Sequence, residues 1–191
     1  MNLLKKLAYK ISEPILGKIN PLRDCHSGET FYILGDGISL KWFDLNNLTR
    51  FKSISLAYIP YHLDVKSINL KYSFLTQPYW FYPLQYVPHE NRYIINKIQP
   101  YYRHLIKNSN DIKYFINLSN FPVLRGNNVY HLFKKIPGKK FDFVEDCLSS
   151  GEEIYGGAFR AAITIAIYMG IKTLYLVGCD YTHENSLVGH W

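Results

Sequence analysis

The chain has 191 residues, of which 48% are hydrophobic and 19% are charged, the composition of one globular domain with a substantial core. Its net charge of +7 and pI near 9.2 favour anionic partners such as phosphates, acidic lipids or nucleic acids. Three cysteines without a C-x-x-C spacing, and no apolar run of about 18 residues, argue against a disulfide framework, a zinc site and a membrane helix.

Residues 1–19 form the first predicted element. Leucine and isoleucine recur there at helical spacing with lysines among them, and Pro14 predicts a break or kink. The pattern predicts a basic amphipathic helix that packs across the domain; the alternative is a helix that makes peripheral contact with a membrane. We assign residues 1–28 to this helix and a following loop, and residues 29–191 to the main domain.

A strand, turn and helix unit follows. Residues 30–34 are apolar and β-rich, and they end at Gly35-Asp36-Gly37. Ser39 is expected to cap a helix over residues 39–48. Further strands are predicted at residues 53–58, 68–75 and 112–118, with a helix over about residues 91–107. The prolines and aromatic residues of segment 77–88 exclude a central strand or a helix and predict an ordered surface loop or lid.

The C-terminal third has the clearest pattern. Ser150 and Glu153 fit a capping box, and residues 158–169 are apolar almost all round, as in a helix buried against a sheet. Gly170 ends that helix, and residues 171–177 form the near-continuous apolar strand typical of parallel sheets. Strands that alternate with helices predict an α/β fold, a Rossmann-like parallel sheet with flanking helices.

Two loops follow predicted strands at the edge where parallel sheets bind ligands, residues 35–39 and residues 178–183. Gly35 and Gly37 permit a sharp turn and close approach to a ligand, although a turn needed only for packing has the same sequence. Asp36 suits a sugar hydroxyl, a base amine or a metal better than a phosphate. Asp180 is a candidate catalytic carboxylate, or a carboxylate that fixes its loop.

Other polar residues extend this candidate site. His183 and His190 are candidate general bases, because imidazole titrates near neutral pH. Tyr155-Gly156-Gly157 makes a third turn expected to face a ligand, and Arg160 in the following helix can pair with a phosphate or with a surface carboxylate. No cluster with metal-ligand spacing is present, so we assign no metal site.

Two segments resemble known enzymes. Residues 31–40, FYILGDGISL, resemble the opening strand and G-N-G-P-S-L turn of the bacterial CMP-sialic-acid-dependent sialyltransferases, with Asp36 and Ile38 in place of the asparagine and the proline. Residues 156–180, GGAFRAAITIAIYMGIKTLYLVGCD, are similar to their small-residue turn, buried helix and strand that ends in G-x-D. Both features are shared with the related motility-accessory and hydroxymethylpterin pyrophosphokinase-like domains.

The resemblance implies a nucleotide-sugar site. By it, Gly35, Asp36, Gly37 and Ser39 hold the phosphate and sugar of a CMP-linked donor, the turn at residues 155–157 lines the same cleft, and Asp180 helps to form its floor. The implied substrates are this CMP-sugar and a glycan or glycolipid acceptor, with no required cofactor. The sialyltransferases carry their catalytic histidine well beyond the G-x-D strand, whereas this sequence ends eleven residues after Asp180. We therefore expect a fragment of a longer gene product, or a protein that binds without turnover.

The sequence predicts a glycosyltransferase-like protein of surface-polysaccharide or glycan biosynthesis, cytoplasmic or peripheral at the inner membrane through residues 1–19. One alternative is a pyrophosphokinase-like enzyme that uses ATP and Mg²⁺, with Asp36 and Asp180 as metal ligands. Another is a truncated, non-catalytic nucleotide-binding module. No zinc-finger, RNP or basic-zipper motif is present, so we expect no nucleic-acid partner.

Overall fold

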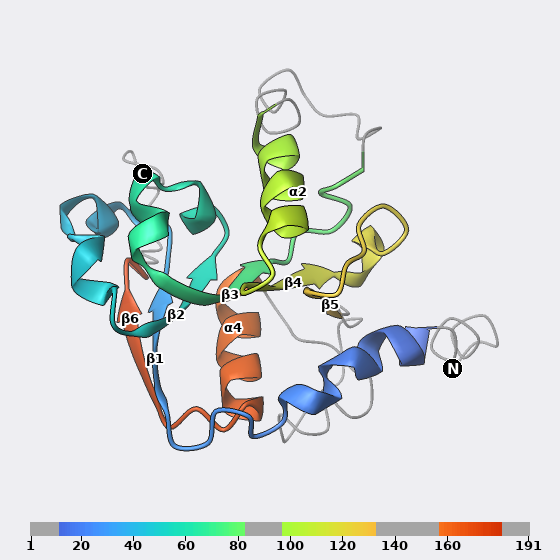
Figure 1. The fold of residues 1–191 in the computed structure, drawn as a ribbon, viewed down its shortest axis with the longest axis horizontal. Helices are drawn as coiled ribbons and strands as arrows, with labels where there is room; N and C mark the ends of the chain where they lie inside the picture. Colours follow the sequence, from blue (N-terminus) through green and yellow to red (C-terminus); the bar gives the residue numbers. More distant parts are fainter. Residues whose placement is uncertain (1–11, 83–96, 133–156, 181–191) are drawn as a thin grey trace.

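The computed structural model describes residues 12–82, 97–132 and 157–180 (Figure 1). These residues form a sheet of six strands in the order β5-β4-β3-β2-β1-β6, and every neighbouring pair is parallel. The predicted α/β, Rossmann-like class is confirmed. The strands are β1 (Thr30–Leu34), β2 (Lys52–Leu56), β3 (Asn69–Leu75), β4 (Lys113–Asn117), β5 (Val129–Leu132) and β6 (Thr173–Val177).

Helices cover both faces of the sheet. The α-helices α2 (Gln99–Asn108) and α4 (Gly157–Tyr168) lie on opposite sides of it (Figure 1). Short 3-10 turns supply the remaining cover: η1 (Gly17–Leu22), η2 (Ile38–Trp42), η3 (Leu45–Leu48), η4 (Ile59–Tyr61), η5 (Leu63–Ser67) and η8 (Leu118–Asn120). This three-layer arrangement explains why most residues of β1 to β5 are buried on both faces. The edge strand β6 is less covered, and its Tyr175 and Leu176 are each 52% exposed.

The core has two sides because successive strand residues point to opposite faces. On one face, Phe31, Ile54 and Phe115 pack with the buried alanines and isoleucine of α4 and with η1. On the other face, Tyr114 and Ile116 pack against α2, while Leu34 of β1 packs against the 3-10 turns. Burial of one such large side chain contributes about 1.5–3 kcal/mol, so the sheet is held from both sides.

The prediction of one helix after β1 is wrong, because the structure has two short 3-10 turns there. Residues 38–48 form the two 3-10 turns η2 and η3, and the residue before η2 is Gly37, without a side-chain cap. Ser39 does not cap a helix, because its hydroxyl and N–H both donate to Asp180. Asp44 then starts the second turn by accepting a hydrogen bond from the N–H of Asn46 at 2.9 Å, which favours a fresh turn over a continued helix.

The segment predicted as a surface loop or lid is in part a core segment. Trp80 and Phe81 are 7% and 0% exposed and pack with Tyr102 of α2. The amide oxygen of Asn120 accepts from the N–H of Phe81 at 2.9 Å, which fixes this non-helical backbone. Tyr79 has a φ of 54° and is 57% exposed. Prolines and aromatic residues therefore predict irregular backbone here, but not exposure.

The other described strands and helices agree with prediction to within a few residues, apart from two differences. Strand β5 is absent from the prediction, and η1 continues through Pro21 to Leu22 where a loop was expected. The described part of the helix predicted over residues 91–107 contains α2 from Gln99, and residues 91–96 lie outside the described residues. The predicted capping box at residues 150–153 and most of the N-terminal helix also lie outside them.

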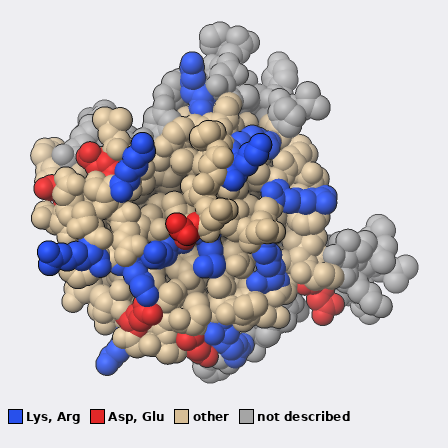
Figure 2. Space-filling view, in the orientation of Figure 1, with Lys and Arg blue, Asp and Glu red and all other residues tan. Residues whose placement is uncertain are grey.

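Positive charge is distributed over the molecule. Figure 2 shows Lys and Arg spread across the visible face, with fewer acidic groups between them. Within the described ranges, no helix has both the length and the apolarity that a bilayer span requires.

Candidate functional site

The strand order reverses between β1 and β6. From β1 the chain adds β2, β3, β4 and β5 on one side, and α4 then returns it to β6 on the other side of β1. In open α/β sheets, such a reversal leaves a crevice outside the carboxyl ends of the two strands, where ligands bind. The two predicted loops leave these two strands, which pair in register from Thr30 with Thr173 to Leu34 with Val177. The structure therefore brings the loops together as expected.

The glycines of the two loops are required by this contact. The N–H of Gly35 donates to the carbonyl of Val177, and the N–H of Gly37 to that of Gly178, both at 2.8 Å. A Cβ at Gly35 would lie 2.3 Å from the Gly178 carbonyl oxygen, and a Cβ at Gly37 would lie 2.2 Å from Asp180 Oδ1. Gly178 itself has a φ of +65°. Packing between the loops thus accounts for all three glycines without a ligand.

Asp180 is held by Ser39. The Ser39 hydroxyl donates to Asp180 Oδ1 at 2.5 Å, and the Ser39 N–H donates to Oδ2 at 3.1 Å. The hydrogen bond from the Ser39 hydroxyl has the largest effect on Asp180 and lowers the pKa of its carboxyl below the ordinary value. The N–H of Ser39 acts in the same direction, and desolvation opposes both. The carboxylate therefore stays ionised and fixes the loop after β1, which is the loop-fixing role considered for it from the sequence. A lowered pKa makes it a weak general base.

Asp36 lies near titrating groups that follow both neighbouring strands, Tyr58 after β2 and Cys179 after β6. Its side chain is buried, with the residue 5% exposed. Its negative charge adds to burial in raising the pKa of Tyr58, which follows β2, and of Tyr102 on α2. The Tyr102 hydroxyl donates to the carbonyl of Ala57 at 2.7 Å, and Ala57 has a φ of 38°. Asp36 thus belongs to a polar and aromatic group at the ends of β1 and β2.

Buried hydroxyls continue this group below the carboxyl edge. Ser55 of β2 pairs with Leu34 in the sheet, and Ser73 of β3 pairs with Ser55. The hydroxyl oxygens of both serines are buried and have no hydrogen-bond partner among the described residues. Buried hydroxyls normally form hydrogen bonds with protein groups or ordered water. The two serines therefore make this face of the sheet polar below the group around Asp36.

Sequence reasoning did not single out Tyr58, Ser55 and Ser73. Tyr58 stands two residues after β2, the position at the end of a parallel strand that led to Asp36 and Asp180 on their own strands. The predicted strand covered residues 53–58, so Tyr58 counted as a strand residue until the structure ended β2 at Leu56. The serines carry no such signal, because a small polar residue inside a strand is common on a half-buried face.

The remaining predicted residues are only partly placed. Gly157 begins α4 with a φ of +79° and has open space around its Cβ position. The far end of α4 contacts the residues before β1, where the N–H groups of Asp24 and His26 donate to the carbonyls of Tyr168 and Met169. Helix α4 therefore runs antiparallel to the strands, and its first turn, with exposed Arg160, is directed toward the carboxyl edge.

Four predicted site residues lie outside the described residues: Tyr155, Gly156, His183 and His190. Within the described residues, no group of three or more His, Cys, Asp or Glu side chains lies close enough together to hold a metal ion. The described part of the candidate site therefore consists of the interlocked glycine loops, the Ser39–Asp180 pair and the group around Asp36.

Comparison with known proteins adds the following. No family model matches the chain, and no curated protein matches it. A similar solved structure is that of the MAf glycosyltransferase from Magnetospirillum magneticum AMB-1, with 14% sequence identity and a TM-score of 0.46 over 89% of this chain. The chain spans only 27% of that protein's length. At this level the similarity carries no functional argument, so function is argued from the site.

Proposed function

We propose that the carboxyl edge of β1 and β6 binds the nucleotide-sugar donor of a glycosyltransferase-like reaction in glycan or surface-polysaccharide synthesis. The observation that carries the proposal is the reversal of strand order at this edge, with the buried carboxylate of Asp36 beside it. Ligands of open parallel sheets bind in such a crevice. The resemblance of residues 31–40 and 156–180 to CMP-sugar enzymes supports the donor class.

Asp36 supplies the specific recognition in this proposal. The carboxyl oxygens of an aspartate accept hydrogen bonds, so they suit ribose or sugar hydroxyls and the amine of cytosine. The unpartnered hydroxyls of Ser55 and Ser73 support a polar ligand or ordered water on the same face. The donor phosphate lies near the first turn of α4, because helix N-termini and the exposed Arg160 both favour negative charge.

Gly35, Gly37, Ser39 and Asp180 shape the crevice in this scheme. Asp180 already accepts from the hydroxyl and the N–H of Ser39, so a donor phosphate is not expected to occupy that loop. Gly37 lets the loop pass within 2.8 Å of the Gly178 carbonyl. The two loops are thereby preorganised, which lowers the entropy cost of ligand binding.

The reaction proposed is direct displacement at the sugar. The acceptor hydroxyl oxygen forms a bond to the anomeric carbon, the bond from that carbon to the donor phosphate oxygen breaks, and CMP leaves with the electron pair. A general base takes the proton of the acceptor hydroxyl. His183 and His190, both outside the described residues, are the candidates for that base. The acceptor is a glycan or a glycolipid.

Thermal unfolding of the chain with CMP, CDP, UDP and ATP, each with and without Mg²⁺, tests the proposal. A ligand at 100 times its dissociation constant adds about 2.7 kcal/mol, a rise in Tm of roughly 5 to 11 °C for a chain of this size. We expect a metal-independent rise with CMP. Asp36→Asn keeps the shape of the side chain and should abolish the rise, whereas the exposed control Asp111→Asn should retain it.

Other results would replace the proposal. A rise with ATP that requires Mg²⁺ would favour the pyrophosphokinase-like alternative. A rise with CMP without any hydrolysis or transfer of a CMP-linked sugar would favour a non-catalytic binding module. If no nucleotide raises the Tm, the carboxyl edge does not bind the donor, and the interlocked loops are structural.

A further inference from the structure

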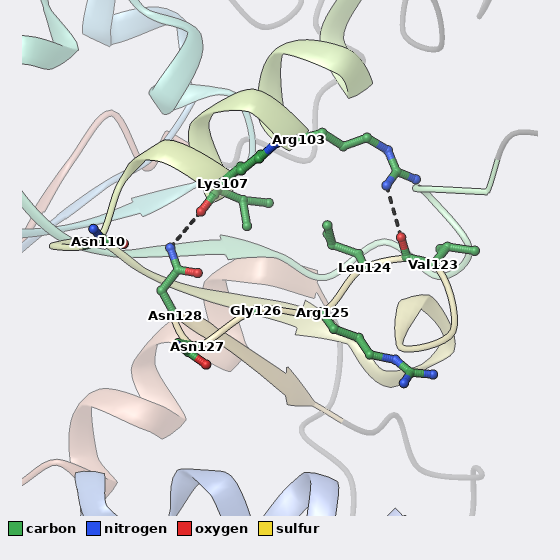
Figure 3. Close-up of a pocket in the computed structure, with 10 residues that line it drawn as sticks. Arg103, Lys107, Asn110, Val123, Leu124, Arg125, Gly126, Asn127 and Asn128 are labelled. Atoms are coloured by element: carbon green, nitrogen blue, oxygen red, sulfur yellow. Dashed lines mark hydrogen bonds between the residues drawn. The ribbon is translucent and has the colours of Figure 1, made fainter.

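A second concave site lies at the opposite end of the sheet. A pocket of about 480 Å³ opens between the C-terminal half of α2 and the loop of residues 121–128 that leads into β5 (Figure 3). Its size falls within the usual range for small-molecule sites. Strands β5 and β6 are opposite edges of the sheet, five strand spacings or roughly 24 Å apart at about 4.8 Å per spacing, so the pocket lies far from the β1–β6 edge.

The lining of this pocket is positively charged. Arg103 and Lys107 of α2 and Arg125 of the loop contribute to it, and none of the ten lining residues is acidic. The ion pairs of the described residues involve His26, Lys52 and His62 and none of these three cations. Arg103 and Lys107 stand four residues apart on one helix, where like charges repel. The negative end of the α2 helix dipole stabilises the charge of Lys107, which lies in the last turn, but not that of Arg103 in the middle of the helix.

The two guanidinium groups are held in place by neutral groups. Arg103 donates to the carbonyls of Val123, at 3.0 Å, and Phe81. Arg125 donates from Nε to the carbonyl of Phe121 at 3.0 Å, and its Cζ lies 4.2 Å from the centre of the Phe121 ring. A guanidinium has five N–H donors, and these bonds use two of those of Arg103 and one of those of Arg125. Fixed cations with spare donors are suited to phosphate or carboxylate.

The loop itself is fastened from several sides. Lys18 Nζ donates to the carbonyls of Gly126 and Val129 at 2.6 and 2.8 Å, which brings a fourth positive charge beneath the loop. The amide nitrogen of Asn128 donates to the carbonyls of Ile106 and Ser109 at 2.9 and 2.6 Å, tying the loop to the end of α2 (Figure 3). The pocket is therefore formed without a ligand, which reduces the cost of ordering on binding.

Amide side chains complete the lining. Asn110 and Asn127 are exposed, and each carries both donors and an acceptor. Such groups suit hydroxyls, whereas the cations suit an anionic group on the same ligand. A concave pocket of this volume encloses a compact molecule rather than a polymer strand.

We propose that the pocket between α2 and the loop of residues 121–128 binds a small phosphorylated polyol, of the sugar-phosphate class. The positive charges of Arg103, Lys107 and Arg125 attract the phosphate, and the amides of Asn110 and Asn127 serve the hydroxyls. This site is separate from the proposed donor crevice and does not depend on it. The phosphorylated group is that of a free metabolite or of a lipid headgroup, two sources with the same chemistry.

Isothermal titration of the full chain with glucose 6-phosphate, glucose and inorganic phosphate tests the site. We expect glucose 6-phosphate to bind more tightly than phosphate, and glucose not to bind. Lys107→Gln and Arg125→Gln, both at exposed positions, should each weaken binding of glucose 6-phosphate about fivefold to tenfold and reduce its salt dependence. Lys66→Gln removes the same charge from an exposed residue of η5 and should leave binding unchanged.

Vesicles containing phosphatidylinositol phosphate distinguish the two sources. Retention on these vesicles that is lost in Lys107→Gln and Arg125→Gln, with weak binding of glucose 6-phosphate, assigns the pocket to a headgroup. Equal weakening of glucose 6-phosphate binding by Lys66→Gln would show a general charge effect and overturn the proposal. The proposal would also be overturned if neither glucose 6-phosphate nor the vesicles bind. Binding to double-stranded DNA, tested as a third probe, without binding to the other two would overturn it as well. The CMP experiment with Asp36→Asn is independent of these outcomes.

Discussion

Ser39 and Asp180, 141 residues apart in the sequence, are joined by two hydrogen bonds that tie the loop after β1 to the loop after β6. The pair spans the strand-order reversal at which the ligand crevice is expected. Asp180 therefore fastens the two loops together, while the proposed function assigns ligand recognition to Asp36.

Ser39→Ala should destabilise the fold in a pH-dependent way. Loss of the hydroxyl bond to an ionised, half-buried carboxylate costs about 1 kcal/mol at pH 7. The folded state lowers the pKa of the Asp180 carboxyl. The contribution of this carboxylate to the free energy of unfolding is therefore complete above its unfolded pKa, and it is lost as pH falls through the lower folded pKa. Urea unfolding at pH 7 and near pH 3 should therefore show a difference between wild type and variant that shrinks at the acid end.

The control for Ser39→Ala is Ser67→Ala. The Ser67 hydroxyl donates to the backbone carbonyl of Asp64 at 2.8 Å, so its removal involves no titrating partner. Its cost should be the same at both pH values. A pH-independent cost for Ser39→Ala as well would contradict the assigned role of the Asp180 carboxylate.

Gly37→Ala should be severely destabilising. The added Cβ would lie 2.2 Å from Asp180 Oδ1 and 2.6 Å from the Gly178 carbonyl oxygen, and the second contact is with backbone. We expect a loss of about 2 kcal/mol or more in urea unfolding. Gly17→Ala is the matched control, because its Cβ would meet only Asn20 Nδ2, at 3.7 Å. Combination with Asp180→Ala should relieve part of the Gly37→Ala cost but not all of it, and full additivity would show that the two positions are not in contact.

The strands of this fold were predictable where the sequence is continuously apolar. Residues 30–34 lie inside the parallel sheet, where strands are apolar on both faces. Residues 173–177 are equally apolar but form the edge strand β6, whose side chains are partly exposed. Strand β5 was missed because it has only four residues, VYHL, and follows Asn127-Asn128. The sequence pattern of so short a run is the same as that of a loop that contains a few apolar residues.

The site was predictable in position and not in its internal contacts. The rule of strand ends located Asp36 and Asp180, because it depends only on strand and loop order. The Ser39–Asp180 bonds require β6 to lie beside β1, and adjacency in a sheet is a tertiary property that no local pattern reports. The same contact replaced the predicted helix cap at Ser39. The burial of Trp80 and Phe81 was likewise decided by α2, which covers them.

His131 should make the fold sensitive to mild acid. Burial lowers the pKa of its imidazole to about 4, and the nearby charges of Lys18 and Arg125 act in the same direction. A lowered folded pKa means that stability is complete above the unfolded pKa, about 6.5, and declines as pH falls toward 4. The loss amounts to about 3 kcal/mol at most. The pKa from histidine NMR and urea unfolding between pH 7 and 4 measure it, and His131→Gln should remove this pH dependence.

Trp80 and Trp42 offer a direct test of the corrected Pro-aromatic segment. Trp80 is 7% exposed and contacts the rings of Phe81 and Tyr102, with centroids 4.8 and 5.3 Å away, whereas Trp42 is 78% exposed. Trp80→Ala should cost about 3–5 kcal/mol, the usual loss for a buried aromatic residue, while Trp42→Ala should change stability by less than about 0.5 kcal/mol. A surface lid would make the two variants alike in urea unfolding. A large cost confined to Trp80→Ala identifies the segment as core, held against α2 next to the Arg103 side of the proposed anion pocket.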